Sequence, residues 1–377
     1  MKCSYNFKMI LLLSLFYYFY FSIVGIYIIF LPKILSGVGY SASEIGIIFA
    51  AAPLIRFILP FLFIRGLQLN STIFNASLLL VLLSALSFYF TLENFYFLLL
   101  SNVFLGIGLS LILPYVELIS LADIGKERYG KVRLFGSLGF IIVALVLVKF
   151  LSTAYVALHF LLALSLFMTT IAYFVQNLSV KAAEETSEFH HNDIDLFGDY
   201  KFWLALLLMQ MSFGSFYNFF TIYETDRGVS LDMTIYLWSF GVVVEVAMLF
   251  FQGKFLRGNL LTVLQVTIFA TIIRWFLVFA YPTTLGVLFF AQSLHALSFA
   301  LFHSAAISYL FMHYKHKSLA QQFFSGISYG LGGLSGAILS GLVYEYFPSY
   351  LFLSSSFIAF LAFVMVSLYK RGEAPLA

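Results

Sequence analysis

The sequence predicts an all-α integral membrane protein in which twelve transmembrane helices form two pseudo-symmetric six-helix bundles. Three observations predict this class: the composition, the number of long apolar segments, and an internal repeat. Of the 377 residues, 62% are hydrophobic and 10% are charged, and the mean hydropathy is +1.00. A soluble domain carries about 25% charged residues. This chain has too little polar surface for water, so we expect the lipid bilayer to be its solvent.

Twelve apolar segments are long enough to cross a bilayer, which takes about 20 residues. They lie at 9–31, 41–64, 70–92, 95–121, 132–151, 154–176, 201–224, 232–252, 259–281, 283–311, 319–343 and 348–369. The first follows Lys2 and Lys8 as a signal peptide would, but it is 23 residues long and lacks a small-residue cleavage site. We therefore predict an uncleaved first helix. For 283–311 we expect a re-entrant or interfacial turn at one end.

The chain repeats itself at an offset of 189 residues. Residues 40–65 and 229–254 both start at a Gly-rich turn, run apolar for a bilayer's width and end on a cation, with Arg56 and Glu245 at equivalent places. At an offset of 190, Asn102 pairs with Gln292. Repeats of this kind are typical of secondary transporters.

The longest polar segment lies at the midpoint and divides the repeats. It predicts an N-terminal bundle at 1–176, a cytoplasmic linker at 177–200 and a C-terminal bundle at 201–377. The linker holds six acids, which we expect to be solvated: Glu184, Glu185, Glu188, Asp193, Asp195 and Asp199.

Positive charge predicts the orientation, because cytoplasmic loops are enriched in Lys and Arg. With the N-terminus inside, fourteen cations are cytoplasmic: Lys2, Lys8, Arg65, Lys126, Arg128, Lys131, Lys181, Lys201, Lys254, Arg257, Lys315, Lys317, Lys370 and Arg371. Only Lys33, Lys149 and Arg227 fall outside. We therefore predict a multi-pass protein of the cytoplasmic (inner) membrane with both termini in the cytoplasm.

Several classes of protein are not indicated. The net charge of +3 and the lack of a basic run give no sign of nucleic-acid binding. Cys3 is the only cysteine, which leaves no internal disulfide and no thiolate zinc site. We find no catalytic motif and no P-loop, so we expect neither an enzyme, nor a metal or cofactor, nor ATP as the energy source. We expect a proton gradient to be the energy source, with a Na⁺ gradient as the alternative. We also expect the protein to function as a monomer.

Charged residues inside spans are few, and they cost about 2.5–3.5 kcal/mol each on insertion scales. Within the spans they are Arg56, Glu117, Glu245 and Arg274, with Arg133 at the start of span 5. Arginines can anchor an anion, and a carboxyl group in a medium of low dielectric constant can hold a proton at neutral pH. The structural alternative is that Arg–Glu pairs only join helices. This structural alternative applies best to the pair Arg56 and Glu245.

Polar residues also form stripes. Asn102 and Glu117 lie about 60° apart around span 4, and Gln292, His295 and His303 fall within an arc of about 80° on span 10, by α-helix geometry. A single histidine is often a packing residue, but this set predicts a water-lined face.

Small residues predict close helix contacts after spans 4 and 10. They are Gly136 and Gly139 near the start of span 5, and the pairs Gly326/Gly330 and Gly332/Gly336 on span 11.

Five segments carry a resemblance to a known family: GIIFAA (46–51), PYVE (114–117), YGKVRLFGSLGF (129–140), TIIRWF (271–276) and LHALSFALFH (294–303). Together with the two six-helix halves, they make the whole chain resemble the major facilitator superfamily. Within it, the chain looks like the branch of the lactose, nucleoside and phenylpropionate permeases. The YGxxRxxGSxGF pattern and the histidine of span 10 are most similar to the phenylpropionate permeases.

The resemblance implies a rocker-switch proton symporter with a central cavity. Glu117 and Arg133 match the sugar-binding acid and arginine of the lactose permease. Arg274 and His295 match its arginine of span 9 and its histidine of span 10.

Three positions depart from the lactose permease or its superfamily. Ser298 stands in place of the coupling acid, Gln292 stands in place of a lysine, and the loop 63–69 lacks the usual Asp-containing pattern. The coupling scheme therefore does not carry over. Either Glu117, Glu245 or His295 then carries the proton, or the coupling differs from that of the lactose permease.

The leading hypothesis is a proton symporter of a small organic molecule, with an aromatic carboxylate such as phenylpropionate favoured over a sugar or nucleoside. The predicted substrate-binding residues are Arg133, Glu117, Arg274, Asn102 and Gln292. The predicted proton-coupling residues are Glu245, Glu117, His295 and His303. Efflux by proton antiport uses the same residues. A non-transporting receptor or assembly factor on a transporter-like fold is the third possibility.

Overall fold

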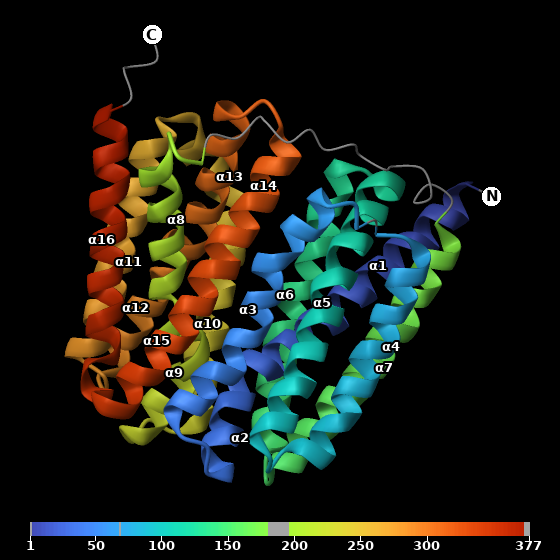
Figure 1. Ribbon diagram of the computed structural model, residues 1–377, viewed down its shortest axis with the longest axis horizontal. Coiled ribbons are helices and arrows are strands. Elements are labelled where there is room, and N and C mark those ends of the chain that lie inside the picture. The colour runs from blue at the N-terminus through green and yellow to red at the C-terminus, as the bar shows by residue number, and fades with distance from the viewer. Residues whose placement is uncertain (1, 68, 180–195, 373–377) are drawn as a thin grey trace. The chain divides into compact units, whose positions relative to one another are not determined.

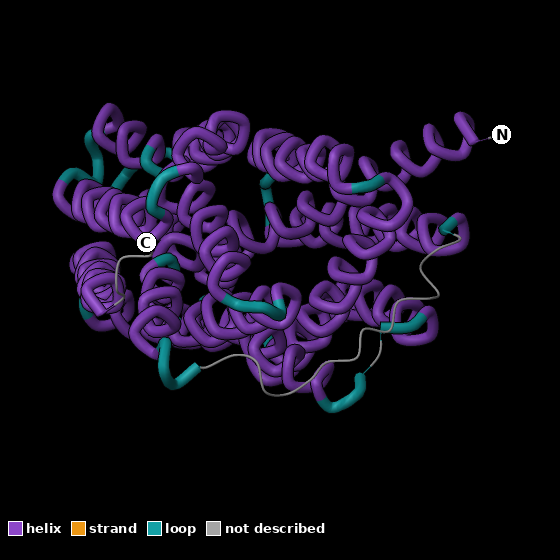
Figure 2. Tube along the Cα trace, turned by 90° about the horizontal axis from the view of Figure 1, so that it is seen from above, coloured by secondary structure: helices purple, strands orange, loops and turns teal. Residues whose placement is uncertain are grey.

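The computed structural model describes residues 2–67, 69–179 and 196–372. Over these ranges the chain consists of helices joined by short loops, without a strand (Figure 2). Twelve helical segments of the described chain are long and apolar enough to cross a membrane: Phe7–Val38, Ala42–Phe63, Ser71–Thr91, Phe95–Ile124, Arg128–Phe150, Ala154–Leu178, Tyr200–Asp226, Leu231–Arg257, Leu260–Ala280, Leu285–His313, Leu319–Tyr346 and Pro348–Gly372. The predicted all-α class with twelve spans is confirmed. Most of the predicted linker lies outside the described residues.

The helices group into two compact units by their contacts. The first holds Met1–Tyr40 and Arg65–Glu188, and the second holds Ser41–Ile64 and Phe189–Ala377. The helix at 42–64 joins the second unit because it packs against residues 325–346. The division into halves at 1–176 and 201–377 stays a prediction.

The first unit (Figure 1) contains α1 (Lys2–Gly25), a π-helical turn (Ile26–Phe30), α2 (Leu31–Val38), α4 (Ser71–Thr91), α5 (Phe95–Ile124), α6 (Lys126–Phe150) and α7 (Ala154–Leu178). Helix α1 packs along α6 and α7, and α4 packs along α5 and α7.

The first span runs seven residues beyond the predicted end at Leu31, to Val38. The prediction stopped there because Pro32 and Lys33 follow. In the structure Pro32 lies in the first turn of α2, directly after the π-helical turn. A proline is tolerated in a first turn because its φ suits the helix and its missing N–H is not needed. The residue after Val38 is Gly39, whose backbone is left-handed with φ 111° and ends the helix.

The second unit contains α3 (Ala42–Ile64), α8 (Tyr200–Ser212), α9 (Gly214–Asp226), α10 (Leu231–Phe251), a 3₁₀ segment (Gln252–Arg257), α11 (Leu260–Ala280), α12 (Leu285–Ser293), a π-helical turn (Ala296–Leu301), α13 (Phe302–His313), α14 (Lys317–Phe324), a π-helical segment (Ser325–Gly332), α15 (Gly333–Tyr346), a 3₁₀ turn (Pro348–Tyr350) and α16 (Leu351–Gly372). Between α12 and α13 the span Leu285–His313 contains the π-helical turn, and the re-entrant or interfacial turn expected at one end of 283–311 stays a prediction.

The predicted small residues do lie at close helix contacts. A Cβ on Gly139 would stand 2.0 Å from the carbonyl oxygen of Tyr18, so α6 approaches α1 at backbone distance. A Cβ on Gly330 would meet the Phe57 backbone of α3 at 2.7 Å, and one on Gly336 would meet the Met211 carbonyl at 2.6 Å. No larger residue fits these contacts without a backbone shift.

Candidate functional site

The first unit carries a cluster around Glu117 and Arg133, which we call the Arg133 cluster. The Tyr129 hydroxyl donates to Glu117 Oε1 at 3.0 Å, and Arg133 Nε lies 3.6 Å from the same oxygen. Tyr129 and Arg133 are four residues apart on α6, so they share one face of that helix. The side chains of Arg133 and Glu117 are 34% and 31% exposed. Both charges are thus paired and still accessible.

Aromatic rings of α1 flank this arginine. The Arg133 guanidinium lies 4.0 Å from the ring centre of Phe21 and 5.4 Å from that of Tyr17. The Tyr17 hydroxyl is bonded to Ser120 Oγ of α5 at 3.1 Å. Gly136, one turn after Arg133, leaves room for Phe21, since a Cβ there would stand 2.6 Å from that ring. The guanidinium therefore lies against an apolar aromatic surface at cation–π distance.

The second unit carries a cluster around Arg274, which we call the Arg274 cluster. Arg274 of α11 has no accessible surface. Its Nη1 is 2.8 Å from His295 Nδ1 and donates to Ser298 Oγ at 3.0 Å, and its Nη2 donates to Gln292 Oε1 at 2.8 Å. In this conformation the arginine holds other side chains in place and does not reach a solute.

Rings also enclose this second arginine. Its guanidinium lies 4.5 Å from the ring centre of Phe216 and 4.4 Å from that of Trp275. His295 stacks on Phe299 with ring centres 5.2 Å apart and planes 4° apart. The imidazole is therefore fixed in both position and plane.

The hydrogen bond from Arg274 decides the tautomer of His295. A guanidinium has only donors, so Nδ1 of His295 must accept, and a neutral ring then carries its proton on Nε2. Nε2 lies 3.2 Å from Glu245 Oε2 of α10. The result is a directed chain in which Arg274 donates to His295 and His295 donates to Glu245. Glu245 is 18% exposed and His295 is 7% exposed, so the acid is the more accessible member.

The π-helical turn in the middle of span 10 shapes this cluster. It begins directly after His295 and includes Ser298, and both residues reach the same nitrogen of Arg274. The same π-helical turn lies between His295 and His303. His303 Nδ1 is 2.7 Å from the Tyr329 hydroxyl, on the π-helical segment of span 11.

The structure also places two other predicted residues, Asn102 and Arg56. Asn102 is fully buried within the first unit. Arg56 lies on α3, and among the described residues no ion pair joins it to Glu245, which contacts His295. Its place among the site residues stays a prediction.

Several contributing residues were not singled out by the sequence. Tyr129, Phe21 and Trp275 are aromatic, and in a chain with 47 Phe and 24 Tyr no pattern marks a functional ring. Tyr129 had the best available signal, because it opens the YGxxRxxG pattern four residues before Arg133. Within the described ranges, no group of three or more His, Cys, Asp or Glu side chains is placed to hold a metal ion.

A helical protein with twelve spans and ionisable clusters inside them has the architecture of a secondary transporter. The chain belongs to the MFS_1 like family, which it matches over residues 10–354. This confirms the predicted superfamily and the prediction of a transporter rather than an enzyme.

Relatives with known names support the same family. The "Probable 3-phenylpropionic acid transporter" of Escherichia coli (strain K12) is 26% identical over 347 residues, which are 89% of this chain and 91% of that protein. The nucleoside transporter NupG has a similar structure, with a TM-score of 0.80 and 17% identity over 96% of this chain and 99% of NupG. A POT family peptide transporter also has a similar structure, with a TM-score of 0.76 and 11% identity over 98% of both chains. At these identities the structural likeness shows the fold alone.

Proposed function

We propose that the protein is a proton-coupled symporter of a small organic solute that works by alternating access, and that the solute is an aromatic carboxylate such as 3-phenylpropionate. The observation that carries this proposal is the Arg133 cluster, where a partly exposed guanidinium lies 4.0 Å from the ring centre of Phe21 and beside an acid. The name of the relative from Escherichia coli supports the same solute class.

Arg133 is suited to bind a carboxylate with an aromatic group. A guanidinium offers five donors in a planar fork that matches a carboxylate. The rings of Phe21 and Tyr17 beside it supply an apolar surface for a phenyl group. We propose Arg133 as the anchor of the solute's carboxylate.

Glu117 links solute binding to proton binding in this proposal. Its carboxylate lies 3.6 Å from Arg133 Nε and competes with an incoming carboxylate for the same cation. Protonation of Glu117 removes that competition, so Arg133 binds the solute best when Glu117 holds a proton.

Glu245 is the second proton carrier in this proposal, and Arg274, His295 and Gln292 position it. His295 accepts from Arg274, so it is committed as a donor toward Glu245 and gains a second proton only by losing the bond from Arg274. Glu245 has no such constraint and is partly exposed. We assign the proton to the acid and the positioning to the histidine.

Uptake into proteoliposomes tests the solute and the coupling together. The panel is 3-phenylpropionate, a disaccharide and a nucleoside, under an inward proton gradient without Na⁺. We expect accumulation of 3-phenylpropionate that a protonophore abolishes. Accumulation of another class instead would contradict the solute assignment, and full accumulation in both Glu117→Gln and Glu245→Gln would contradict the proton assignment. The same vesicles preloaded with solute test efflux by antiport.

We also propose that the protein lies in the cytoplasmic membrane as a monomer, with both termini in the cytoplasm. The excess of Lys and Arg in the segments assigned to the inside supports this orientation. A fluorescent protein fused to the C-terminus is expected to fold and fluoresce. A reporter enzyme that works only outside the cytoplasm should be inactive at the same position. Activity of that fusion would contradict the orientation.

A further inference from the structure

Arg56 is a charged residue within α3 that neither the Arg133 cluster nor the Arg274 cluster contains. Its side chain is exposed, and it makes no hydrogen bond or ion pair within the described residues. A permanent charge inside a span is costly, so it is normally turned toward water or toward a partner. Because Arg56 has no such partner in the described chain, the direction in which it points decides what it can bind.

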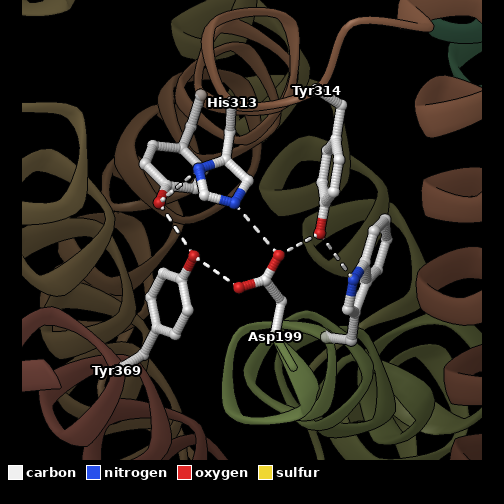
Figure 3. A network of polar contacts seen from close by, with 6 residues as sticks. Asp199, His313, Tyr314 and Tyr369 are labelled. Atoms are coloured by element: carbon white, nitrogen blue, oxygen red, sulfur yellow. Dashed lines mark hydrogen bonds and ion pairs between the residues drawn. The ribbon is translucent and has the colours of Figure 1, made fainter. Parts of the chain in front are cut away.

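The acids of the second unit do not neutralise Arg56. Glu245 contacts His295, and Figure 3 shows the Asp199 carboxylate held by three side chains, those of His313, Tyr314 and Tyr369. The other described acids of this unit lie in the first or last turn of their helices: Glu44, Glu224, Asp226, Asp232 and Glu345. Arg56 follows Glu44 by three turns of α3, which is about 18 Å.

The rotation of α3 about its own axis is fixed by span 11 (Leu319–Tyr346). A Cβ on Gly341 would stand 2.8 Å from the Ala42 carbonyl oxygen, and one on Gly330 would stand 2.7 Å from the Phe57 backbone. The two helices therefore touch at backbone distance near both ends of α3. Close contacts of this kind leave no room for α3 to turn, so packing sets the direction of Arg56.

The side of α3 that carries Arg56 is turned into the protein. The large apolar residues that α3 exposes lie on the other side, about 120–180° away around the axis: Ile47, Leu54, Ile58, Phe61 and Leu62. We expect that side to face lipid. Ile45 and Phe49 lie within about 20° of Arg56, and both are buried. Arg56 is exposed on an otherwise buried side, so we expect it to be in contact with water and not with lipid.

Arg56 is also too deep in the span to reach the lipid headgroups. Helix α3 continues for about 12 Å beyond it, to Ile64, and the side chains of an α-helix lean toward its N-terminus, away from that end. In the other direction the start of α3 at Ala42 is about 21 Å away. Extension of the side chain to a membrane surface therefore does not explain this charge.

We infer that Arg56 is an anion-binding residue that faces water inside the protein and binds the carboxylate of the carried solute. Its guanidinium offers five donors in a planar fork that matches a carboxylate. Arg133 shares its charge with Glu117, and Arg274 donates to its neighbours, whereas Arg56 has no competing acid. The choice of the solute's carboxylate over an inorganic anion rests on the proposed function. The direction and the unpaired charge of Arg56 do not.

Thiol labelling tests the direction of Arg56 without any solute. Cys3 is the only cysteine, so Cys3→Ser gives a background without thiols. In the full chain in lipid nanodiscs, Ala52→Cys places a thiol one turn before Arg56 on the same side, and Leu54→Cys places one on the side expected to face lipid. Charged thiosulfonates react with thiolates in water. We expect labelling of Ala52→Cys and none of Leu54→Cys. The reverse pattern, or no labelling of either, would overturn the inference.

The same thiol reports the charge of Arg56. An anionic thiosulfonate should react with Ala52→Cys faster than a cationic one, because an unpaired cation attracts anions. Adding Arg56→Gln should lower this ratio of rates by a factor of about 3 or more, as for a unit charge a few ångströms away in water. An unchanged ratio would show that a counter-ion within the protein neutralises Arg56, and the inference would fall.

Binding of 3-phenylpropionate and of its uncharged amide to the purified protein tests the ligand. We expect Arg56→Gln to weaken binding of the acid by about tenfold or more, and to leave binding of the amide unchanged, which also shows that the variant is folded. Arg257→Gln, an exposed arginine of the same unit, is the control and should change neither. Unchanged affinity for the acid in Arg56→Gln would overturn the assignment to the solute's carboxylate.

Failure of the proposed solute gives a different result. If the wild type binds neither the acid nor the amide, the proposed solute is wrong. The ratio of labelling rates at Ala52→Cys then decides by itself whether Arg56 attracts anions.

Discussion

Arg274 Nη1 lies 2.8 Å from His295 Nδ1, and this contact fixes how His295 faces Glu245. Arg274 only donates, so His295 Nδ1 accepts and Nε2–H is directed at the acid. Arg274, which the sequence predicts as a substrate-binding residue, is fully buried and bonded to these neighbours, and its contact with a solute stays a prediction.

Removing Arg274 should therefore destabilise the fold as well as stop transport. Arg274→Gln leaves His295, Ser298 and Gln292 without their shared donor in a buried place. Leaving a buried polar group without its hydrogen-bond partner costs about 1–3 kcal/mol. We expect a large drop in thermal stability in detergent, measured on purified protein. Arg257→Gln, an exposed arginine of the same unit, is the control and should change stability by less than about 0.5 kcal/mol. Unchanged stability in Arg274→Gln would contradict the buried network.

Replacing Arg133 with Lys should weaken binding of a carboxylate selectively. Lysine keeps the charge but loses the planar fork and its stacking on Phe21. We expect about a tenfold loss of affinity for 3-phenylpropionate, and little change for its uncharged amide. Binding of both compounds to the purified protein is the measurement. Equal losses for acid and amide would show that Arg133 shapes the site without reading the carboxylate.

Gly139→Ala should destabilise the first unit. The new Cβ would stand 2.0 Å from the Tyr18 carbonyl oxygen, so α1 and α6 must separate. Overpacking of this kind costs about 1–3 kcal/mol. Gly130→Ala, on the same helix with nothing within 4 Å, is the matched control and should stabilise the helix by up to about 1 kcal/mol. Thermal unfolding in detergent measures the change in stability of both variants. A change in the same direction for Gly139→Ala and Gly130→Ala would contradict the close contact between α1 and α6.

The sequence predicts the spans well because twenty apolar residues leave few alternatives in a bilayer. The sequence also predicts that Gln292 and His295 lie on one helix face, because they are three residues apart. Both contact Arg274. The place of His303 on the same face stays a prediction, because the π-helical turn between His295 and His303 is not foreseen by α-helix geometry. Asp199 was expected in a solvated linker because its partners, such as His313 at a separation of 114 residues, depend on tertiary packing.

The most direct test of the proposed coupling follows protons in vesicles that contain a pH-sensitive dye. An inward gradient of 3-phenylpropionate should drive protons inward and acidify the lumen in the wild type. In Glu245→Gln the amide still accepts from His295 but carries no proton, and Glu117 remains as a proton carrier, so we expect solute entry to continue while acidification is slower than in the wild type. Acidification at the wild-type rate in Glu245→Gln would contradict the assignment of the proton to Glu245.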